Sequence, residues 1–210
     1  MYRNYIKRAL DFILALLGLV ILSPVYLILI LLVRIKLGSP VFFGQERPGY
    51  QEKIFRLHKF RTMTDARDEN GKLLPDRERL TKFGRLLRRT SLDELPELVN
   101  ILKGEMSFIG PRPLLPEYLP YYTQEERLRH TVRPGLTGLA QASGRNLVNW
   151  DRRLAYDVEY VKGLSFAMDC RVIVKTVQTV FGHSETVADD TNAAEGNFAE
   201  IRRKRMEEQG

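Results

Sequence analysis

The apolar segment near the N-terminus constrains the fold of this chain more than any other feature. It runs for 22 residues from Phe12 to Val33 without a charge. As a straight helix it would be about 33 Å long, which matches the roughly 30 Å hydrocarbon core of a bilayer. A cleaved signal peptide fits poorly, because the run is too long and no small-residue cleavage site follows it. The segment therefore predicts a membrane element.

The charges around this segment and the proline within it predict how it meets the membrane. Basic residues flank both ends, and positive charge marks the cytoplasmic side of a membrane. Pro24 lacks a backbone N–H and clashes with the carbonyl of Val20, so it breaks or kinks the helix. The hydroxyl of Ser23 can then supply a local hydrogen bond. We expect a re-entrant hairpin that enters and leaves on the cytoplasmic face, with a kinked single span as the alternative.

The net charge of +7 indicates an anionic partner, which could be a phosphate compound, nucleic acid or an acidic lipid headgroup. A nucleic-acid partner is not expected, because no helix-turn-helix, zinc-finger or RNP signature is present. The single cysteine, Cys170, excludes an internal disulfide framework. The three scattered histidines do not suggest a zinc site, which leaves an oxygen-ligated cation open.

Beyond Pro40 the sequence predicts a small mixed domain. Residues 41–49 and 52–63 read as two short strands around a Pro48–Gly49 turn. Two amphipathic helices follow, and Gly104 is expected to end the second. Their apolar stripes are Leu80, Phe83, Leu86 and Leu87 in the first helix, and Leu92, Leu95, Leu98, Val99 and Leu102 in the second.

The second half of the chain predicts irregular structure and then helices. Residues 107–120 are rich in proline and form a rigid, mostly non-helical path that holds Arg112. The glycine-rich residues 133–146 could bring backbone N–H groups close to phosphates, although they lack the P-loop pattern. Residues 150–181 predict one or two helices.

These patterns give an α/β fold that is predominantly helical. We expect residues 1–36 to form the membrane hairpin and residues 37–181 a small cytoplasmic globular domain. The polar tail, residues 182–210, is expected to be mobile and to lie outside the core.

The sequence T-S-L-D-E-L-P places Asp93 and Glu94 one helical turn after a cluster of arginines. Adjacent carboxylates behind arginines suggest a site for phosphorylated substrates. Ser91 and Glu94 fit a capping box, whereas Pro96 favours a helix start nearer Asp93. Either start puts both carboxylates at a helix N-terminus, which lowers the basicity of Asp93 and suits a nucleophile or a metal ligand. Capping alone remains an alternative.

Other charged residues lie in compact or turn-rich segments. Lys59, Arg88 and Arg112 are candidates for phosphate binding, since a guanidinium matches phosphate oxygens; the alternative for each is a surface cation. Asp157 is a spare acid in a predicted helix, where most acids are simply solvated.

Three long motifs now point to a family. They are K-F-R-T-M at 59–63, the run from Thr90 to Pro113 that contains T-S-L-D-E-L-P, and R-P-G-L-T-G-L-A-Q at 133–141. With them the chain resembles the bacterial sugar transferase family, the monotopic polyprenyl-phosphate phosphoglycosyl transferases. The resemblance extends to about Phe181 and is strongest to small members that transfer phospho-N,N′-diacetylbacillosamine.

The resemblance implies a monotopic protein of the bacterial inner membrane, with a re-entrant helix broken at Ser23-Pro24, interfacial amphipathic helices and an active site on the cytoplasmic face. It implies transfer of a sugar 1-phosphate from a UDP-sugar to undecaprenyl phosphate with release of UMP, as the first membrane step of glycoconjugate assembly. A UDP-hexose or UDP-N-acetylhexosamine donor, or a non-catalytic membrane scaffold, is the alternative. A homodimer also stays open.

The resemblance further implies dependence on Mg²⁺ and assigns roles to individual residues. Asp93 would attack the β-phosphorus, form a covalent phosphosugar–aspartyl enzyme and act as a metal ligand. Glu94 would be the second catalytic acid, serving either the metal or the acceptor's proton. The residues expected around the phosphates and the metal are Lys59, Arg88, Arg112 and Asp157.

Overall fold

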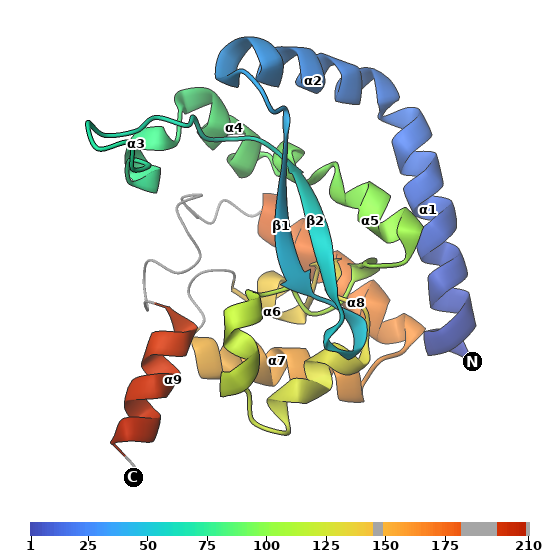
Figure 1. Cartoon of the computed structure of the whole chain (residues 1–210). Coiled ribbons are helices and arrows are strands. Elements are labelled where there is room, and N and C mark those ends of the chain that lie inside the picture. The colour runs from blue at the N-terminus through green and yellow to red at the C-terminus, as the bar shows by residue number, and fades with distance from the viewer. Residues whose placement is uncertain (145–148, 182–196, 209–210) are drawn as a thin grey trace.

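The N-terminal apolar segment is a broken helix. The computed structural model describes residues 1–144, 149–181 and 197–208. After a π-helical turn at Tyr2–Ile6, helix α1 covers Lys7–Ile21 and α2 covers Ser23–Leu37, with a bend of 64° between them (Figure 1). Pro24 lies in the first turn of α2, and Oγ of Ser23 donates a hydrogen bond of 2.8 Å to the carbonyl of Val20. The predicted break at Ser23-Pro24 is confirmed.

The two helices together have the dimensions of a membrane segment. Within the part of the chain that the structure describes, no single helix is long and apolar enough to cross a bilayer. The bent pair α1–α2, taken together, has the required length and apolar character. Large apolar side chains are exposed along this pair: Phe12, Ile13, Leu16, Leu17, Val20, Ile21, Leu27, Ile28, Leu31 and Ile35. An exposed apolar surface of this extent marks contact with a membrane or another apolar partner.

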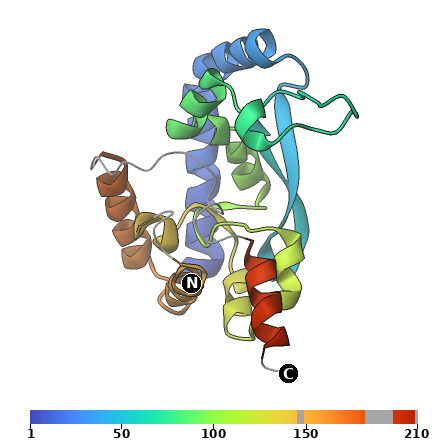
Figure 2. The same cartoon turned by 90° about the vertical axis from the view of Figure 1, so that its left-hand side faces the viewer.

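The opposite sides of α1 and α2 pack on the rest of the protein. Ala15 of α1 joins a buried cluster with Leu57 and Ile101, while Val33 of α2 packs with Phe60. The predicted membrane element therefore packs on the globular domain through two buried clusters. Helix α1 lies along one side of the molecule, and α2 lies across its top (Figures 1 and 2).

The two strands predicted around the Pro48–Gly49 turn are present and form a β-hairpin. Strand β1, Phe42–Pro48, pairs antiparallel with β2, Ile54–Phe60, and a 3₁₀ turn, Tyr50–Glu52, connects them. Along β2 the side chains alternate, so Phe55 and Leu57 enter the core while Arg56 is exposed.

Both amphipathic helices begin later in the chain than their apolar stripes. A turn of helix α3, Asp76–Arg79, precedes α4, Lys82–Arg89. A 3₁₀ turn, Leu92–Glu94, then leads into α5, Glu97–Lys103. Gly104 ends α5 with a left-handed backbone (φ 84°), as predicted.

A short parallel strand pair follows that the sequence did not predict. Strand β3, Ser107–Ile109, pairs with β4, Gly135–Thr137. A Cβ on Gly135 would lie 2.1 Å from the amide nitrogen of Gly110, and the N–H of Gly135 donates to the carbonyl of Pro111. These glycines thus serve close backbone packing, and the N–H of Gly135 is not free for a phosphate.

The remaining elements are helical. They are the 3₁₀ segments η4 (Pro116–Tyr121) and η5 (Glu126–Thr131), and the helices α6 (Leu139–Ala142), α7 (Trp150–Lys162), α8 (Phe166–Phe181) and α9 (Phe198–Glu207). The prediction of one or two helices between residues 150 and 181 is confirmed.

The tail is only partly described, and there it differs from the expectation. Residues 182–196 and 209–210 lie outside the described residues. Phe198 of α9 is fully buried against Tyr118, Tyr122 and Trp150, and α9 lies beside η4 (Figure 2). The prediction that the whole tail lies outside the core was therefore wrong for α9, since one aromatic side chain anchors it.

Candidate active site

Asp93 and Glu94 lie in the 3₁₀ turn between α4 and α5. The chain enters this turn through Ser91, whose backbone is left-handed (φ 55°), and Pro96 directly precedes α5. The side chain of Ser91 caps no helix, so the capping-box alternative is wrong. A start nearer Asp93 agrees with a turn that begins at Leu92. Capping therefore does not account for the two carboxylates.

Glu94 is held between two cations from distant parts of the chain. Its Oε1 accepts hydrogen bonds from Nζ of Lys59 at 2.6 Å and from Nη2 of Arg112 at 2.8 Å. Burial alone would raise the pKa of Glu94, but the charges of Arg112 and Lys59 outweigh it and lower the pKa to about 2. Glu94 is therefore ionised at neutral pH and fixes both cations at one point.

A third carboxylate, Glu97, belongs to the same cluster and was missed by the sequence reasoning. Its side chain is buried, and Oε1 lies 3.3 Å from Nζ of Lys59 as an ion pair without hydrogen-bond geometry. Burial raises the pKa of Glu97 to about 7 against the opposing charge of Lys59. Its spacing of three residues after Glu94 was the available signal, because residues at that spacing share a helical face.

Asp93 is the carboxylate that the three predicted cations surround. It is buried, with 7% of its surface exposed. Burial raises the pKa of Asp93; the charges of Lys59, Arg88 and Arg112 oppose this rise, and that of Glu94 adds to it. The expectation that a helix N-terminus lowers the basicity of Asp93 was wrong, because desolvation is the larger effect. A more basic carboxylate is also a better nucleophile.

Arg88 reaches the cluster because α4 packs tightly on the K-F-R-T-M segment. Its Nε donates a hydrogen bond of 3.2 Å to Oγ1 of Thr62. The close approach depends on Gly84, since a Cβ there would lie 1.9 Å from the carbonyl oxygen of Thr62. Both Arg88 and Lys59 are thereby held next to Asp93.

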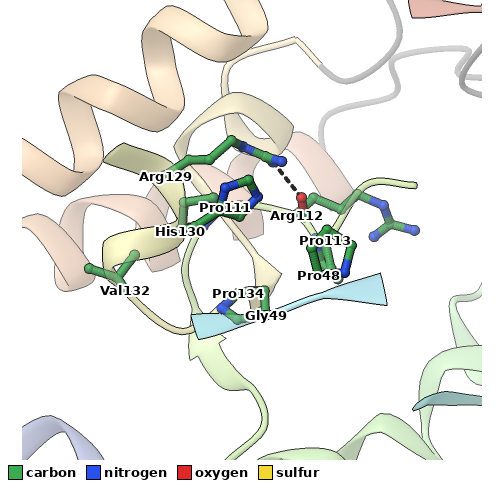
Figure 3. Close-up of a pocket in the computed structure, with 9 residues that line it drawn as sticks. All are labelled: Pro48, Gly49, Pro111, Arg112, Pro113, Arg129, His130, Val132 and Pro134. Carbon is green, nitrogen blue, oxygen red and sulfur yellow. Dashed lines mark hydrogen bonds between the residues drawn. The ribbon is translucent and has the colours of Figure 1, made fainter. Parts of the chain in front are cut away.

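Asp157 lies away from this cluster, behind Arg112. It is 2% exposed, and its Oδ2 accepts hydrogen bonds from Nε and Nη2 of Arg129 at 3.1 and 2.9 Å. The same Nη2 donates to the backbone carbonyl of Arg112 at 2.6 Å (Figure 3). Asp157 therefore touches Arg112 through Arg129. A direct contact with substrate stays a prediction for Asp157, and Arg129 is a further residue that the sequence reasoning missed.

A small cavity of about 10 Å³ lies on the far side of this backbone. The residues that line it include Arg129, His130 and Pro111, while the side chain of Arg112 points away from it (Figure 3). His130 is buried and neither ring nitrogen has a hydrogen-bond partner among the described residues. Burial lowers the pKa of His130 to about 3, so the ring is neutral. Asp93, Glu94 and Glu97 do not line this cavity, and Arg112 is the residue that it shares with the carboxylate cluster.

The carboxylates supply some, but not all, of the ligands that a cation such as Mg²⁺ needs. Among the described residues, no three side chains of His, Cys, Asp or Glu are arranged to hold a metal ion. Asp93 and Glu94 do offer oxygen donors, and Mg²⁺ commonly binds one or two carboxylates together with substrate phosphates. The donor set thus fits an ion that is shared with a diphosphate.

Comparisons with known proteins identify the family of this chain. The model of the bacterial sugar transferase family matches residues 2–183. The chain is similar to the uncharacterized sugar transferase EpsL of Bacillus subtilis, with 52% identity over 83% of this chain and 87% of EpsL. It is similar to the exopolysaccharide production protein ExoY of Sinorhizobium fredii, with 38% identity over 83% of this chain and 84% of ExoY.

A longer relative carries a more specific name. The undecaprenyl-phosphate galactose phosphotransferase of Salmonella typhimurium is 36% identical over 84% of this chain and 40% of that protein. The family model covers nearly the whole described chain, and the matched range contains the carboxylates and cations of the cluster. The chain belongs to the bacterial sugar transferase family, an enzyme family that includes undecaprenyl-phosphate sugar phosphotransferases.

Proposed function

We propose that this chain transfers a sugar 1-phosphate from a UDP-sugar to undecaprenyl phosphate and releases UMP, in the first membrane step of polysaccharide assembly. Membership of the family supports the reaction, and so do the names of two relatives. One is named as a phosphotransferase that uses undecaprenyl phosphate, and the other as an exopolysaccharide production protein.

The observation that carries this proposal is the set of three cations around a buried carboxylate. Lys59, Arg88 and Arg112 come from three separate segments, and the charge of each acts on Asp93. A carboxylate approaching a diphosphate is repelled by its negative charge. Three fixed cations offset that repulsion and stabilise the charge that develops during transfer.

The first step is attack by one Oδ of Asp93 on the β-phosphorus of the UDP-sugar. A bond forms between Oδ and the phosphorus, while the bond from that phosphorus to the bridging oxygen breaks. UMP leaves with the bridging oxygen and its electron pair. The sugar phosphate is now held on Asp93 as an acyl phosphate, a bond that a carboxylate can form and later release.

The second step regenerates the enzyme. An oxygen of undecaprenyl phosphate attacks the same phosphorus, and the bond from phosphorus to Oδ of Asp93 breaks. The product is an undecaprenyl diphosphate sugar, and Asp93 is again a carboxylate. The same three cations serve both steps, because both pass through a transition state with negative charge on the phosphoryl oxygens.

Glu94 is a positioning residue in this scheme. With a pKa of about 2 it is a weak base at neutral pH, and a weak base is poorly suited to taking up the acceptor's proton. It keeps Lys59 and Arg112 beside Asp93 instead. Asp157 is assigned a similar supporting part, through Arg129 and the carbonyl of Arg112.

Mg²⁺ is proposed as the cofactor, held by Asp93 together with the diphosphate of the donor. When bound, Mg²⁺ neutralises phosphate charge and polarises the phosphorus for attack. Lys59, Arg88 and Arg112 orient the remaining phosphate oxygens.

The bent pair α1–α2 would place this site at one face of the inner membrane. Its exposed apolar surface supports insertion, and the positive charge at both ends supports a re-entrant path from the cytoplasmic side. A site that rests on one leaflet meets the phosphate of the acceptor at headgroup level. The lipid then does not have to leave the bilayer.

The donor sugar has several candidates. The galactose in the name of the Salmonella relative supports a UDP-hexose, while the resemblance to small members supports UDP-N,N′-diacetylbacillosamine. A UDP-N-acetylhexosamine is the third candidate. A scaffold without activity would not need Asp93, Glu94 and the three cations together.

The test is release of UMP from a panel of these UDP-sugars with undecaprenyl phosphate and Mg²⁺. We expect release from one donor class that depends on the lipid and on Mg²⁺, and that is abolished by Asp93→Asn. Equal release by wild type and Asp93→Asn would contradict the mechanism. No release from any of the donors would favour the scaffold.

A further inference from the structure

Arg47 is a guanidinium beside Arg112 that the proposed reaction does not yet use. It lies on β1 opposite Phe55, on the face of the hairpin that also carries Lys59. Among the described residues its side chain donates one hydrogen bond, from Nη2 to the amide oxygen of Gln45 at 2.7 Å. It forms no ion pair there, and its buried Nε has no hydrogen-bond partner.

The charge of Arg47 is therefore poorly neutralised. Burial and the neighbouring charge of Arg112 lower the pKa of Arg47 to about 10. Glu97 is the carboxylate whose charge acts on Arg47, but Glu97 forms its ion pair with Lys59. A guanidinium that forms no ion pair, beside a second guanidinium, is suited to binding an oxyanion.

A second buried donor lies near Arg47. Tyr118 of η4 is 1% exposed and interacts electrostatically with Arg47. The backbone N–H of Phe198 lies against the hydroxyl oxygen, but no described residue accepts a hydrogen bond from the O–H. Buried polar groups are nearly always hydrogen-bonded, so an O–H without an acceptor calls for an explanation. An anion between Tyr118 and Arg47 would satisfy both donors.

The position of Arg47 indicates which phosphate binds. Arg112 is held by Glu94, next to the nucleophile; the charge of Arg112 acts on Arg47, but Arg47 is not among the main charges that act on Asp93. In an in-line displacement the leaving group departs on the side opposite to the attacking oxygen. The phosphate next to Arg47 is then the α-phosphate of the donor, which leaves with the nucleoside as UMP.

The direction of the hairpin agrees with a water-soluble ligand. The Phe42 end of β1 packs on Tyr26 of α2, while Arg47 lies five residues further along the strand, roughly 16 Å away at 3.3 Å per residue. The phosphate of a membrane lipid would approach from the α2 end. A nucleotide reaches the Arg47 end from solvent.

We propose that Arg47 and the hydroxyl of Tyr118 form a subsite, next to Arg112, for the phosphate of the departing UMP. The subsite rests on the proposed function for the identity of its ligand. This subsite contacts the UDP-sugar donor and the UMP product, but it does not contact the lipid acceptor.

The experiment compares Arg47→Gln, Arg47→Lys and Tyr118→Phe with Arg56→Gln as the matched control, because Arg56 is an exposed arginine on the other face of the same hairpin. Loss of a charged hydrogen bond to phosphate is expected to weaken inhibition by UMP and to raise the KM for the UDP-sugar about tenfold or more in Arg47→Gln. Arg47→Lys should recover part of the affinity. The KM for undecaprenyl phosphate and all constants of Arg56→Gln should remain at wild-type values.

Tyr118→Phe separates ligand binding from folding. Because no described residue accepts a hydrogen bond from its O–H, we expect little loss of thermal stability together with weaker UMP inhibition. Unchanged inhibition by UMP in folded Arg47→Gln would overturn the subsite. A rise confined to the KM for undecaprenyl phosphate would also overturn the subsite, because that result would assign Arg47 to binding of the lipid.

A binding measurement keeps this inference distinct from the reaction itself. Equilibrium binding of labelled UMP is measured on Asp93→Asn with and without Arg47→Gln, which requires no turnover. Weaker binding in the double variant supports the subsite even if every donor fails in the UMP-release assay. Equal binding contradicts the subsite and leaves the proposed transfer intact.

Discussion

Nζ of Lys59 lies 2.6 Å from Oε1 of Glu94, although the two residues are 35 positions apart in the chain. This contact joins the end of strand β2 to the turn that carries Asp93. Arg112, from the proline-rich segment, binds the same oxygen at 2.8 Å. One carboxylate oxygen thus brings together three segments that the sequence keeps apart, and it fixes two of the three cations that act on Asp93.

Glu94→Gln should destabilise the protein and reduce activity. The carboxylate is largely buried and its removal leaves Lys59 and Arg112 without their shared partner, which is expected to cost about 1–3 kcal/mol. The pKa of Glu94 in the folded state, about 2, is below its ordinary value of 4.5. Its stabilising contribution is therefore complete above pH 4.5 and is lost as the pH falls towards 2.

Thermal unfolding in detergent with EDTA, from pH 7 to pH 3, measures this contribution. The difference between wild type and Glu94→Gln should shrink as the pH falls. Glu46→Gln is the control, because Glu46 is exposed on β1. A difference that is the same at every pH would contradict the ion pairs of Glu94.

Asp93→Asn should remove turnover and leave stability unchanged or higher at pH 7. The pKa of Asp93 is raised in the folded state, so the folded protein binds this proton more tightly than the unfolded chain. Ionisation of Asp93 therefore destabilises the fold as the pH rises above the ordinary value of 3.8. The gain from Asp93→Asn should disappear at low pH. If Asp93→Asn unfolds earlier than wild type at pH 7, the cations outweigh burial and our account of Asp93 is wrong.

Asp157 and Arg129 should act as one unit. Each single variant, Asp157→Asn or Arg129→Lys, is expected to lower kcat about tenfold, since each loosens the backbone of Arg112. In the double variant the second change should add little. Losses that multiply in a double-mutant cycle would instead indicate that Asp157 contacts the substrate directly.

The re-entrant path can be tested by cysteine labelling in a Cys170→Ser background. Tyr5→Cys and Lys36→Cys lie near opposite ends of the bent pair, and both positions are exposed. Both should react with an impermeant reagent only from the cytoplasmic side. Pro24→Ala should let part of the population adopt a straighter helix with opposite labelling. Opposite labelling in the variants that retain Pro24 would establish a full span.

Local chemistry made much of the fold predictable from the sequence. A proline within a long apolar run has to break the helix, and a glycine after Lys103 can adopt the left-handed backbone that ends α5. The hairpin follows from strand-like residues on both sides of Pro48–Gly49. The motifs also predicted a cluster of carboxylates and cations, and the structure brings Glu94, Lys59 and Arg112 into contact; their roles in a reaction stay predictions.

Tertiary packing decided what the sequence could not show. Strands β3 and β4 have three residues each, which is too short for a periodic pattern. Phe198 is one aromatic residue in a polar tail, and only its neighbours in space reveal that it is anchored. The raised pKa of Asp93 and the inclusion of Glu97 depend on burial, which a helix-dipole argument does not contain.

The most direct test of the central claim, that Asp93 is the nucleophile, is the mass of the intact protein after incubation with the preferred UDP-sugar and Mg²⁺ but without lipid. We expect wild type to gain the mass of one sugar phosphate, on a peptide that contains Asp93, and to lose it when undecaprenyl phosphate is added. Asp93→Asn should gain nothing. An active wild-type enzyme that never gains this mass, or an adduct that persists in Asp93→Asn, would contradict the covalent mechanism.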